Sequence, residues 1–100
     1  MLVHTVFFWL RPDLTAEDSE RFAAAVGSLV DIPFVRHGWV GRPAATLDRG
    51  PVDGSYAVGL VVAFDDLDGH DAYQVHPDQL RFVADCAPLW TRVQVYDVDA

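Results

Sequence analysis

The segment from Tyr73 to Gln79, Tyr-Gln-Val-His-Pro-Asp-Gln, carries the residue types best suited to chemistry. It places a phenol, Tyr73, and an imidazole, His76, three residues apart. Pro77 suits the first position of a helix, because its missing N–H would have no intrahelical partner there. His76 then lies at or beside the helix N-cap, where free N–H groups and positive potential favour a developing anion. The segment therefore predicts a small-molecule site at the start of a helix.

A second imidazole, His4, lies in the apolar stretch Leu2 to Leu10, whose β-branched and aromatic residues predict a strand. A polar group set into apolar surroundings is typical of a small-molecule site. His4 is therefore a second candidate for chemistry, far from the first in sequence.

The elements that must position these residues follow the order β-α-β-β-α-β. Strands are expected over 2–10, 34–42, 56–64 and 90–98, and helices over 15–29, 65–73 and 77–87, with a loop over 43–54. This order predicts a ferredoxin-like α+β sandwich, one domain over residues 1–100, with helices on one face of an antiparallel sheet. The other face carries residues such as Phe7 and Trp9 and needs a cover. A second copy of the chain is the simplest cover, so we expect a homodimeric α+β barrel.

Composition limits the partners of the chain. A formal net charge of −8 argues against nucleic acid and against anionic membrane surfaces, both of which need a basic footprint. No stretch reaches the length of a membrane helix, and no secretory signal is expected at the N-terminus. The single cysteine, Cys86, favours a reducing, cytoplasmic location. The absence of lysine excludes a Schiff-base mechanism.

The whole pattern resembles the stress-responsive dimeric α/β-barrel (Dabb) family, with the Tyr-x-x-His-Pro segment as the most specific feature. The matching stretches are His4-Thr5-Val6, Trp39-Val40-Gly41, Tyr56 with Leu60 to Phe64, Ala72 to Pro77, and Val93 to Asp97. The resemblance implies a homodimer with an interior pocket between sheet and helices in each subunit.

One member of that family, the plant olivetolic acid cyclase, closes a polyketide ring by aldol condensation without metal or organic cofactor. The resemblance puts its catalytic Tyr at Tyr73, its catalytic His at Gln79, and the carboxylate that orients that His at Asp97. An amide takes no proton near neutral pH, so this chain lacks the family's base at Gln79. Gln79 would instead orient a substrate by hydrogen bonding.

A replacement for the missing base follows from strand pairing. The first and last strands of a ferredoxin-like sheet are antiparallel neighbours, and if His4 lies opposite Asp97, Val6 pairs with Val95 and Phe8 with Val93. Both polar side chains then face the helices, where the carboxylate would fix the imidazole tautomer and raise its basicity. We therefore expect His4, supported by Asp97, to act as the base and Tyr73 to polarise a carbonyl. The simpler alternatives are a histidine satisfied by a neighbour and a core aromatic.

The remaining expectations concern the pocket and its contents. Its substrate-binding residues are expected to be Phe22, Val26, His76, Gln79, Phe82 and Trp90, with plain core packing as the alternative for the apolar ones and an N-cap without a ligand for His76. No metal is expected, because the four histidines show no i, i+4 pair. His70, among Asp66, Asp68 and Asp71, is expected to be solvated.

The leading functional interpretation is a cofactor-free enzyme of the polyketide-cyclase kind that acts on a hydrophobic carbonyl compound. A cofactor-free monooxygenase of aromatic polyketides, using Trp39 or Trp90, is one alternative. A dimer that binds a ligand without turnover is the other, and the replacement at Gln79 favours it.

Overall fold

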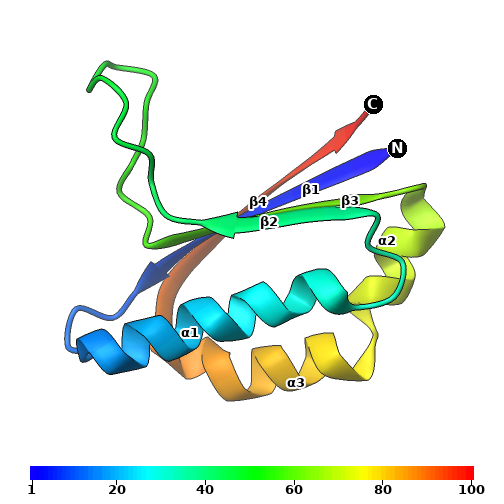
Figure 1. Ribbon diagram of the computed structural model, residues 1–100, viewed down its shortest axis with the longest axis horizontal. Coiled ribbons are helices and arrows are strands. Elements are labelled where there is room, and N and C mark those ends of the chain that lie inside the picture. The colour runs from blue at the N-terminus through cyan, green and yellow to red at the C-terminus, as the bar shows by residue number, and fades with distance from the viewer.

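A four-stranded antiparallel sheet forms one layer of the protein, and the helices form a second layer on one of its faces (Figure 1). The computed structural model describes residues 1–100. The strands are β1 (Leu2–Leu10), β2 (His37–Gly41), β3 (Val58–Phe64) and β4 (Trp90–Asp99), and they lie in the order β2-β3-β1-β4. The helices are α1 (Ala16–Ser28), α2 (Leu67–Gln74) and α3 (Pro77–Cys86), with short 3-10 turns η1 (Leu29–Asp31) and η2 (Ala87–Leu89). The predicted ferredoxin-like α+β fold is confirmed.

Side chains cap the starts of α1 and α3, and the cap at His76 is the one that the sequence predicts. Thr15 caps α1, and its hydroxyl accepts a hydrogen bond from the Asp18 N–H at 3.0 Å. His76 caps α3, where its Nδ1 accepts from the Asp78 N–H at 3.1 Å and Pro77 takes the first helical position. Because the cap satisfies an otherwise free N–H group, the Tyr-x-x-His-Pro segment marks the boundary between α2 and α3.

Strand β1 lies in the centre of the sheet and fixes the position of both its neighbours. It pairs antiparallel with β4 so that His4 faces Asp97, Val6 faces Val95 and Phe8 faces Val93, which is the predicted register. Its pairing with β3 places His4 opposite Val62. Since side chains alternate along a strand, Leu2, His4, Val6 and Phe8 of β1 all face the helices, and they are buried.

The core fills the space between the sheet and the helices. Phe22 and Val26 of α1 are 1% and 0% exposed, and they pack against residues of the central strands such as Phe8 and Leu60. Phe22 also stacks edge-on against Phe8, with ring centroids 5.2 Å apart. Helix α1 therefore serves mainly to close the core.

No helix covers the opposite face of the sheet, and Ser55 and Tyr56 cover only part of it, where they contact Trp9 and Phe7. Trp39, Tyr96 and Val98 are 63%, 58% and 54% exposed there. Phe7 and Trp9 share this face, and the Arg92 guanidinium lies 4.2 Å from the Trp9 ring centroid. A large apolar patch of this kind is typical of a surface that meets a partner. None of the helices is long and apolar enough to cross a bilayer.

Two strands are shorter than the sequence predicts. Strand β2 begins at His37 rather than at residue 34, because the preceding residues turn: Phe34 has a φ of 87°, and Arg36 forms an ion pair with Asp65 at 2.7 Å. Strand β3 begins at Val58, two residues later than expected. The aromatic and β-branched residues just before these two strands fit the strand pattern of the sequence, but they are not paired in the sheet.

Gly38 of β2 allows the sheet to approach η1 closely. A Cβ at this position would lie 2.7 Å from the Cβ of Val30, whereas a Cβ at Gly41 of the same strand would meet nothing within 4 Å. We expect Gly38→Ala to lower the free energy of unfolding by about 1–3 kcal/mol through overpacking. Urea denaturation measures the change, and Gly41→Ala is the matched control, expected to stay near the wild-type value. Equal stability of the two variants would contradict the close approach.

Candidate active site

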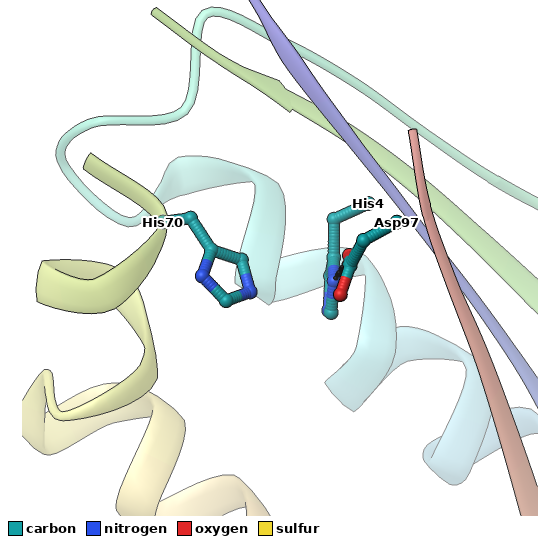
Figure 2. A group of neighbouring side chains, drawn as sticks. All are labelled: His4, His70 and Asp97. Carbon is teal, nitrogen blue, oxygen red and sulfur yellow. Dashed lines mark hydrogen bonds and ion pairs between the residues drawn. The ribbon is translucent and has the colours of Figure 1, made fainter. Parts of the chain in front are cut away.

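The centre of the candidate site is a hydrogen-bonded pair formed across the β1–β4 ladder. His4 Nδ1 lies 2.5 Å from Asp97 Oδ1 (Figure 2). The His4 side chain is 5% exposed and that of Asp97 is 44% exposed, so the pair runs from the interior to the surface. Because an ionised carboxylate only accepts hydrogen bonds, Nδ1 carries the proton and Nε2 keeps its lone pair. This tautomer is the one a general base needs.

His4 lines a cavity between the sheet and the helices. The cavity measures about 140 Å³, and ten of its thirteen lining residues are hydrophobic. Val83 and Val95, each 41% exposed, also line it and mark the side on which it meets solvent. An apolar cavity with a few polar groups is the usual form of a small-molecule site.

Tyr73 reaches the same cavity from the last turn of α2. The residue is 1% exposed, and its ring centroid lies 6.2 Å from that of His4. Burial raises the pKa of the Tyr73 phenol to about 12. The hydroxyl therefore keeps its proton at neutral pH and acts as a neutral hydrogen-bond donor.

The expected substrate-binding residues divide into two groups. Gln79, Phe82 and Trp90 line the cavity together with His4 and Tyr73. The other three do not line it. Phe22 and Val26 are core residues behind the cavity wall, and His76 directs its Nδ1 to the helix N-cap. A helical apolar stripe shows which face is buried, but it does not distinguish solid core from cavity wall.

His70 of α2 lies beside His4, contrary to the expectation that it is solvated (Figure 2). Its side chain is 14% exposed, and the two imidazole centroids are 5.0 Å apart. His70 Nδ1–H donates to Asp71 Oδ1 at 3.0 Å, and the Gln74 amide N–H donates to His70 Nε2 at 3.2 Å. The available signal was the helical spacing of three residues from His70 to the buried Tyr73, which puts both on one face. The surrounding aspartates obscured that signal.

His4, His70 and Asp97 form the group in this structure that comes nearest to a metal site. One ligand atom from each lies within 4.8 Å of the others. A single metal bound at about 2.0–2.2 Å keeps its ligand atoms roughly 3 Å apart, which exceeds the 2.5 Å between His4 and Asp97. Both ring nitrogens of His70 also have partners already. Binding a metal would require the pair to separate and His70 to change partners, whereas a base with an orienting carboxylate would need no such rearrangement.

The protonation of His4 reflects opposing influences. Burial lowers the pKa of the imidazole most, the hydrogen bond and negative charge of Asp97 raise it, and the nearby His70 lowers it again. Burial prevails, and the pKa of His4 lies below its ordinary value of 6.5. The imidazole is therefore neutral at pH 7, with a free lone pair.

A larger hollow of about 470 Å³ lies elsewhere, around Phe34 and the Arg36–Asp65 ion pair. Its lining is mostly polar and includes none of the histidines or tyrosines. The smaller cavity, where acid–base groups and apolar surface meet, is therefore the candidate site.

Comparison with known proteins agrees with this architecture. The model of the stress-responsive A/B barrel domain (Dabb) matches residues 2–100. The chain belongs to the Dabb family. A search of the curated proteins finds no match to the sequence.

Solved structures share the fold of this Dabb chain over nearly its full length. A dimeric ferredoxin-like protein of unknown function from Thermobifida fusca is 26% identical, with a TM-score of 0.78 over 99% of this chain and 90% of that one. The hydroxynitrile lyase of Passiflora edulis is 20% identical, with a TM-score of 0.76 over 97% and 90% of the two chains. An antibiotic-biosynthesis-monooxygenase-like protein from Nitrosomonas europaea is 13% identical, with a TM-score of 0.73 over 100% and 98%. The last two likenesses concern the fold alone.

The lowered pKa of His4 links the stability of this Dabb chain to pH. Above the unfolded-state pKa of about 6.5, His4 is neutral in both the folded and the unfolded state. Folding then needs no free energy to remove a proton from its imidazole. As pH falls through that value, the unfolded chain takes up the proton first, so the free energy of unfolding decreases until the folded-state pKa is reached. We expect urea denaturation between about pH 8 and pH 5 to show this loss, which His4→Asn removes.

His76→Asn is the control for this measurement, because Asn preserves the helix cap and removes an imidazole outside the cavity. Its stability should follow the wild-type pH dependence. An unchanged pH dependence in His4→Asn would contradict the preferential burial of neutral His4.

Proposed function

We propose that this Dabb protein is a metal-free enzyme that makes or breaks a carbon–carbon bond beside a carbonyl group, in the manner of a polyketide cyclase. The observation that carries the proposal is His4, hydrogen-bonded to Asp97 and lying on the wall of an apolar cavity that Tyr73 also lines. A base, a carboxylate that orients it and a neutral donor are the parts that enolate chemistry requires.

In the forward direction, His4 Nε2 takes a proton from the carbon next to a carbonyl group. The C–H electron pair moves into the enolate, and the Tyr73 hydroxyl donates a hydrogen bond to the oxygen that becomes negative. The enolate carbon then attacks a second carbonyl carbon of the same molecule, and the new alkoxide recovers the proton from His4. No electrons enter or leave the substrate, so no redox partner is needed.

The electrostatics of the cavity support these roles. Burial lowers the pKa of His4 and raises that of Tyr73 to about 12, so each group rests in its neutral form. The developing imidazolium is stabilised by Asp97, at 2.5 Å. Few polar groups compete within the cavity, so the donor and the base act with little screening by water.

The hydroxynitrile lyase among the structural neighbours widens the range of substrates worth testing. Cleavage of a cyanohydrin, like a reverse aldol reaction, begins when a base takes a proton and ends when a C–C bond beside an oxygen breaks. His4 and Tyr73 would serve either direction. The proposal therefore concerns addition to carbonyl carbon and its reversal, with aldol-type ring closure as the leading case.

The two alternatives receive different support. Trp90 lines the cavity, as an oxygen-using enzyme of aromatic polyketides would require, but it shares that cavity with the base His4. Trp39 is exposed on the open sheet face and lies outside the cavity, which weakens its candidacy. Gln79 supports the second alternative, a dimer that binds a ligand without turnover. The family resemblance assigns a catalytic histidine to this position, and the chain has an amide there.

We also infer that the protein works as a cytoplasmic homodimer whose open sheet faces meet. The exposed aromatic and aliphatic residues of that face, Trp39, Tyr96 and Val98 among them, support burial against a second copy. The Thermobifida fusca neighbour is described as dimeric. The single buried, unpaired thiol of Cys86 is consistent with a reducing compartment.

Removal of the base tests the proposed chemistry. We expect the wild type to convert short linear β-polyketide thioesters, with products read by mass. His4→Asn should lower kcat/KM by about 10²–10⁴-fold, because it removes a general base. Tyr73→Phe should lower it by about 10²–10³-fold, because it removes the donor to the enolate oxygen.

His76→Asn is the matched control for this experiment and should convert the thioesters at the wild-type rate. Binding of the thioesters by the wild type without any product would make the protein a binder. Conversion by His4→Asn at the wild-type rate would exclude His4 as the base.

Charge placed on the open sheet face tests the dimer. Tyr96→Asp should weaken association, because the interface would bury an unpaired carboxylate. We expect light scattering after gel filtration to show a dimeric wild type and a monomeric variant. Leu80→Asp, which adds the same charge at an exposed position of α3, should remain dimeric. A monomeric wild type would refute the proposed assembly.

A further inference from the structure

Gln79 carries the one buried side-chain polar atom without a hydrogen-bond partner. It lies in the first turn of α3, and its side chain lines the cavity together with His4 and Tyr73. Its Oε1 is buried from solvent and accepts no hydrogen bond. A buried acceptor of this kind loses its contacts with water and gains nothing in return, so it needs a structural or functional reason.

The neighbouring polar groups of the cavity do not supply the missing donor. The N–H of His4 is directed to Asp97, and the amide N–H of Gln74 is directed to His70. His4 Nε2, which carries the lone pair, is an acceptor like Gln79 Oε1. Among the donors of the cavity-lining residues, which also include the Trp90 indole N–H, the Tyr73 hydroxyl is the one that the proposed function directs at a carbonyl oxygen.

The hydrogen-bond acceptors and the donor of the cavity define the ligand that would complement it. Two acceptors, His4 Nε2 and Gln79 Oε1, call for two acidic or polar hydrogens on the guest, and the Tyr73 donor calls for one oxygen acceptor. His4 would take the hydrogen that is removed in the reaction. Gln79 cannot remove a proton, so it would hold a hydroxyl or N–H hydrogen that stays on the guest.

The cavity volume limits the size of the guest. An apolar cavity of about 150 Å³ in a protein core admits one benzene ring. The volume here is about 140 Å³, so a single six-membered ring, or a chain of similar bulk, fills it. Larger guests would have to extend past Val83 and Val95 into solvent.

We infer that Gln79 is a specificity-determining residue, which accepts a hydrogen bond from a hydroxyl group on a guest the size of one ring. The substrate class is then a hydroxyl-bearing carbonyl compound of single-ring size, such as a hydroxylated aromatic or its enol precursor. The carbonyl part of this description rests on the proposed function. The hydroxyl part rests on Gln79 alone.

Fragment binding tests the inference without any catalysis. Phenol and toluene have nearly the same shape, and only phenol donates a hydrogen bond. Chemical-shift titrations by NMR give the dissociation constants of both for the wild type and for Gln79→Met, which keeps the length of the side chain and removes its oxygen. We expect the ratio of the toluene constant to the phenol constant to fall about tenfold in Gln79→Met.

The matched control is Gln94→Met, the same substitution outside the cavity, on the open face of the sheet, where the Gln94 amide oxygen already accepts a hydrogen bond from Arg92. Its ratio should equal that of the wild type. Thermal unfolding gives a further readout: Gln79→Met without ligand should be at least as stable as the wild type, because it removes an unsatisfied buried acceptor.

Three results would overturn the inference. The first is a ratio that Gln79→Met leaves unchanged, which would mean that a water or another group serves the hydroxyl. The second is an equal change in Gln94→Met. The third concerns anisole, which only accepts hydrogen bonds. If the wild type binds anisole more tightly than toluene by the same factor as it binds phenol, the Gln79 amide N–H faces the guest instead of Oε1. Because none of these measurements involves turnover, they are independent of whether the proposed reaction occurs.

Discussion

The register between β1 and β4 is the constraint on which the site depends. It pairs His4 with Asp97 on the face that the helices cover, and the apolar pairs Val6–Val95 and Phe8–Val93 continue the same ladder. A slip of one residue would turn Asp97 to the open face and leave His4 buried without its carboxylate. The apolar pairs therefore hold the polar pair in place. The same ladder brings Met1 beside Ala100, and the Met1 ammonium donates a hydrogen bond to the Ala100 oxygen at 2.9 Å.

Burial favours the neutral form of both groups that the proposed reaction uses. It lowers the pKa of the His4 imidazole and raises that of the Tyr73 phenol, since in each case it disfavours the charged form. One group is thereby kept as an acceptor and the other as a donor over the physiological pH range. Asp97 acts in the opposite direction: its half-exposed carboxylate accepts the hydrogen bond from His4 Nδ1, and it can stabilise a protonated His4 when one forms.

The sequence predicted the parts of this structure that depend on local pattern and period. The order of the elements, the cap at His76 and the register that brings His4 to Asp97 are all confirmed, because a period of two along a strand leaves little freedom once the topology is chosen. It did not predict which buried residues surround empty space. Phe22 and Val26 satisfy the same apolar pattern as Phe82, and only the packing of three helices on the sheet separates core from cavity wall.

His70 was missed for a related reason. Its aspartate neighbours in sequence point to a surface position, whereas its helical face, shared with Tyr73, turns the imidazole inward. The rotation of a short helix of eight residues depends on a few contacts, so local charge gives little information about it. Contacts such as that of His70 with His4, and the missing partner of the Gln79 oxygen, depend on how separate elements pack together. Local sequence patterns do not show them.

The change of residue at position 79 and the presence of His4 are consistent with each other. The resemblance to olivetolic acid cyclase assigns Asp97 the task of orienting a histidine on α3, yet here Asp97 Oδ1 is already bound by His4 at 2.5 Å. A histidine at position 79 would have to share this carboxylate with His4. Once the carboxylate serves a strand residue, an uncharged amide at position 79 avoids that competition and is left free to contact the guest. In the proposed mechanism the base is therefore carried by β1, whose position is fixed by ladders on both sides, rather than by the first turn of a helix.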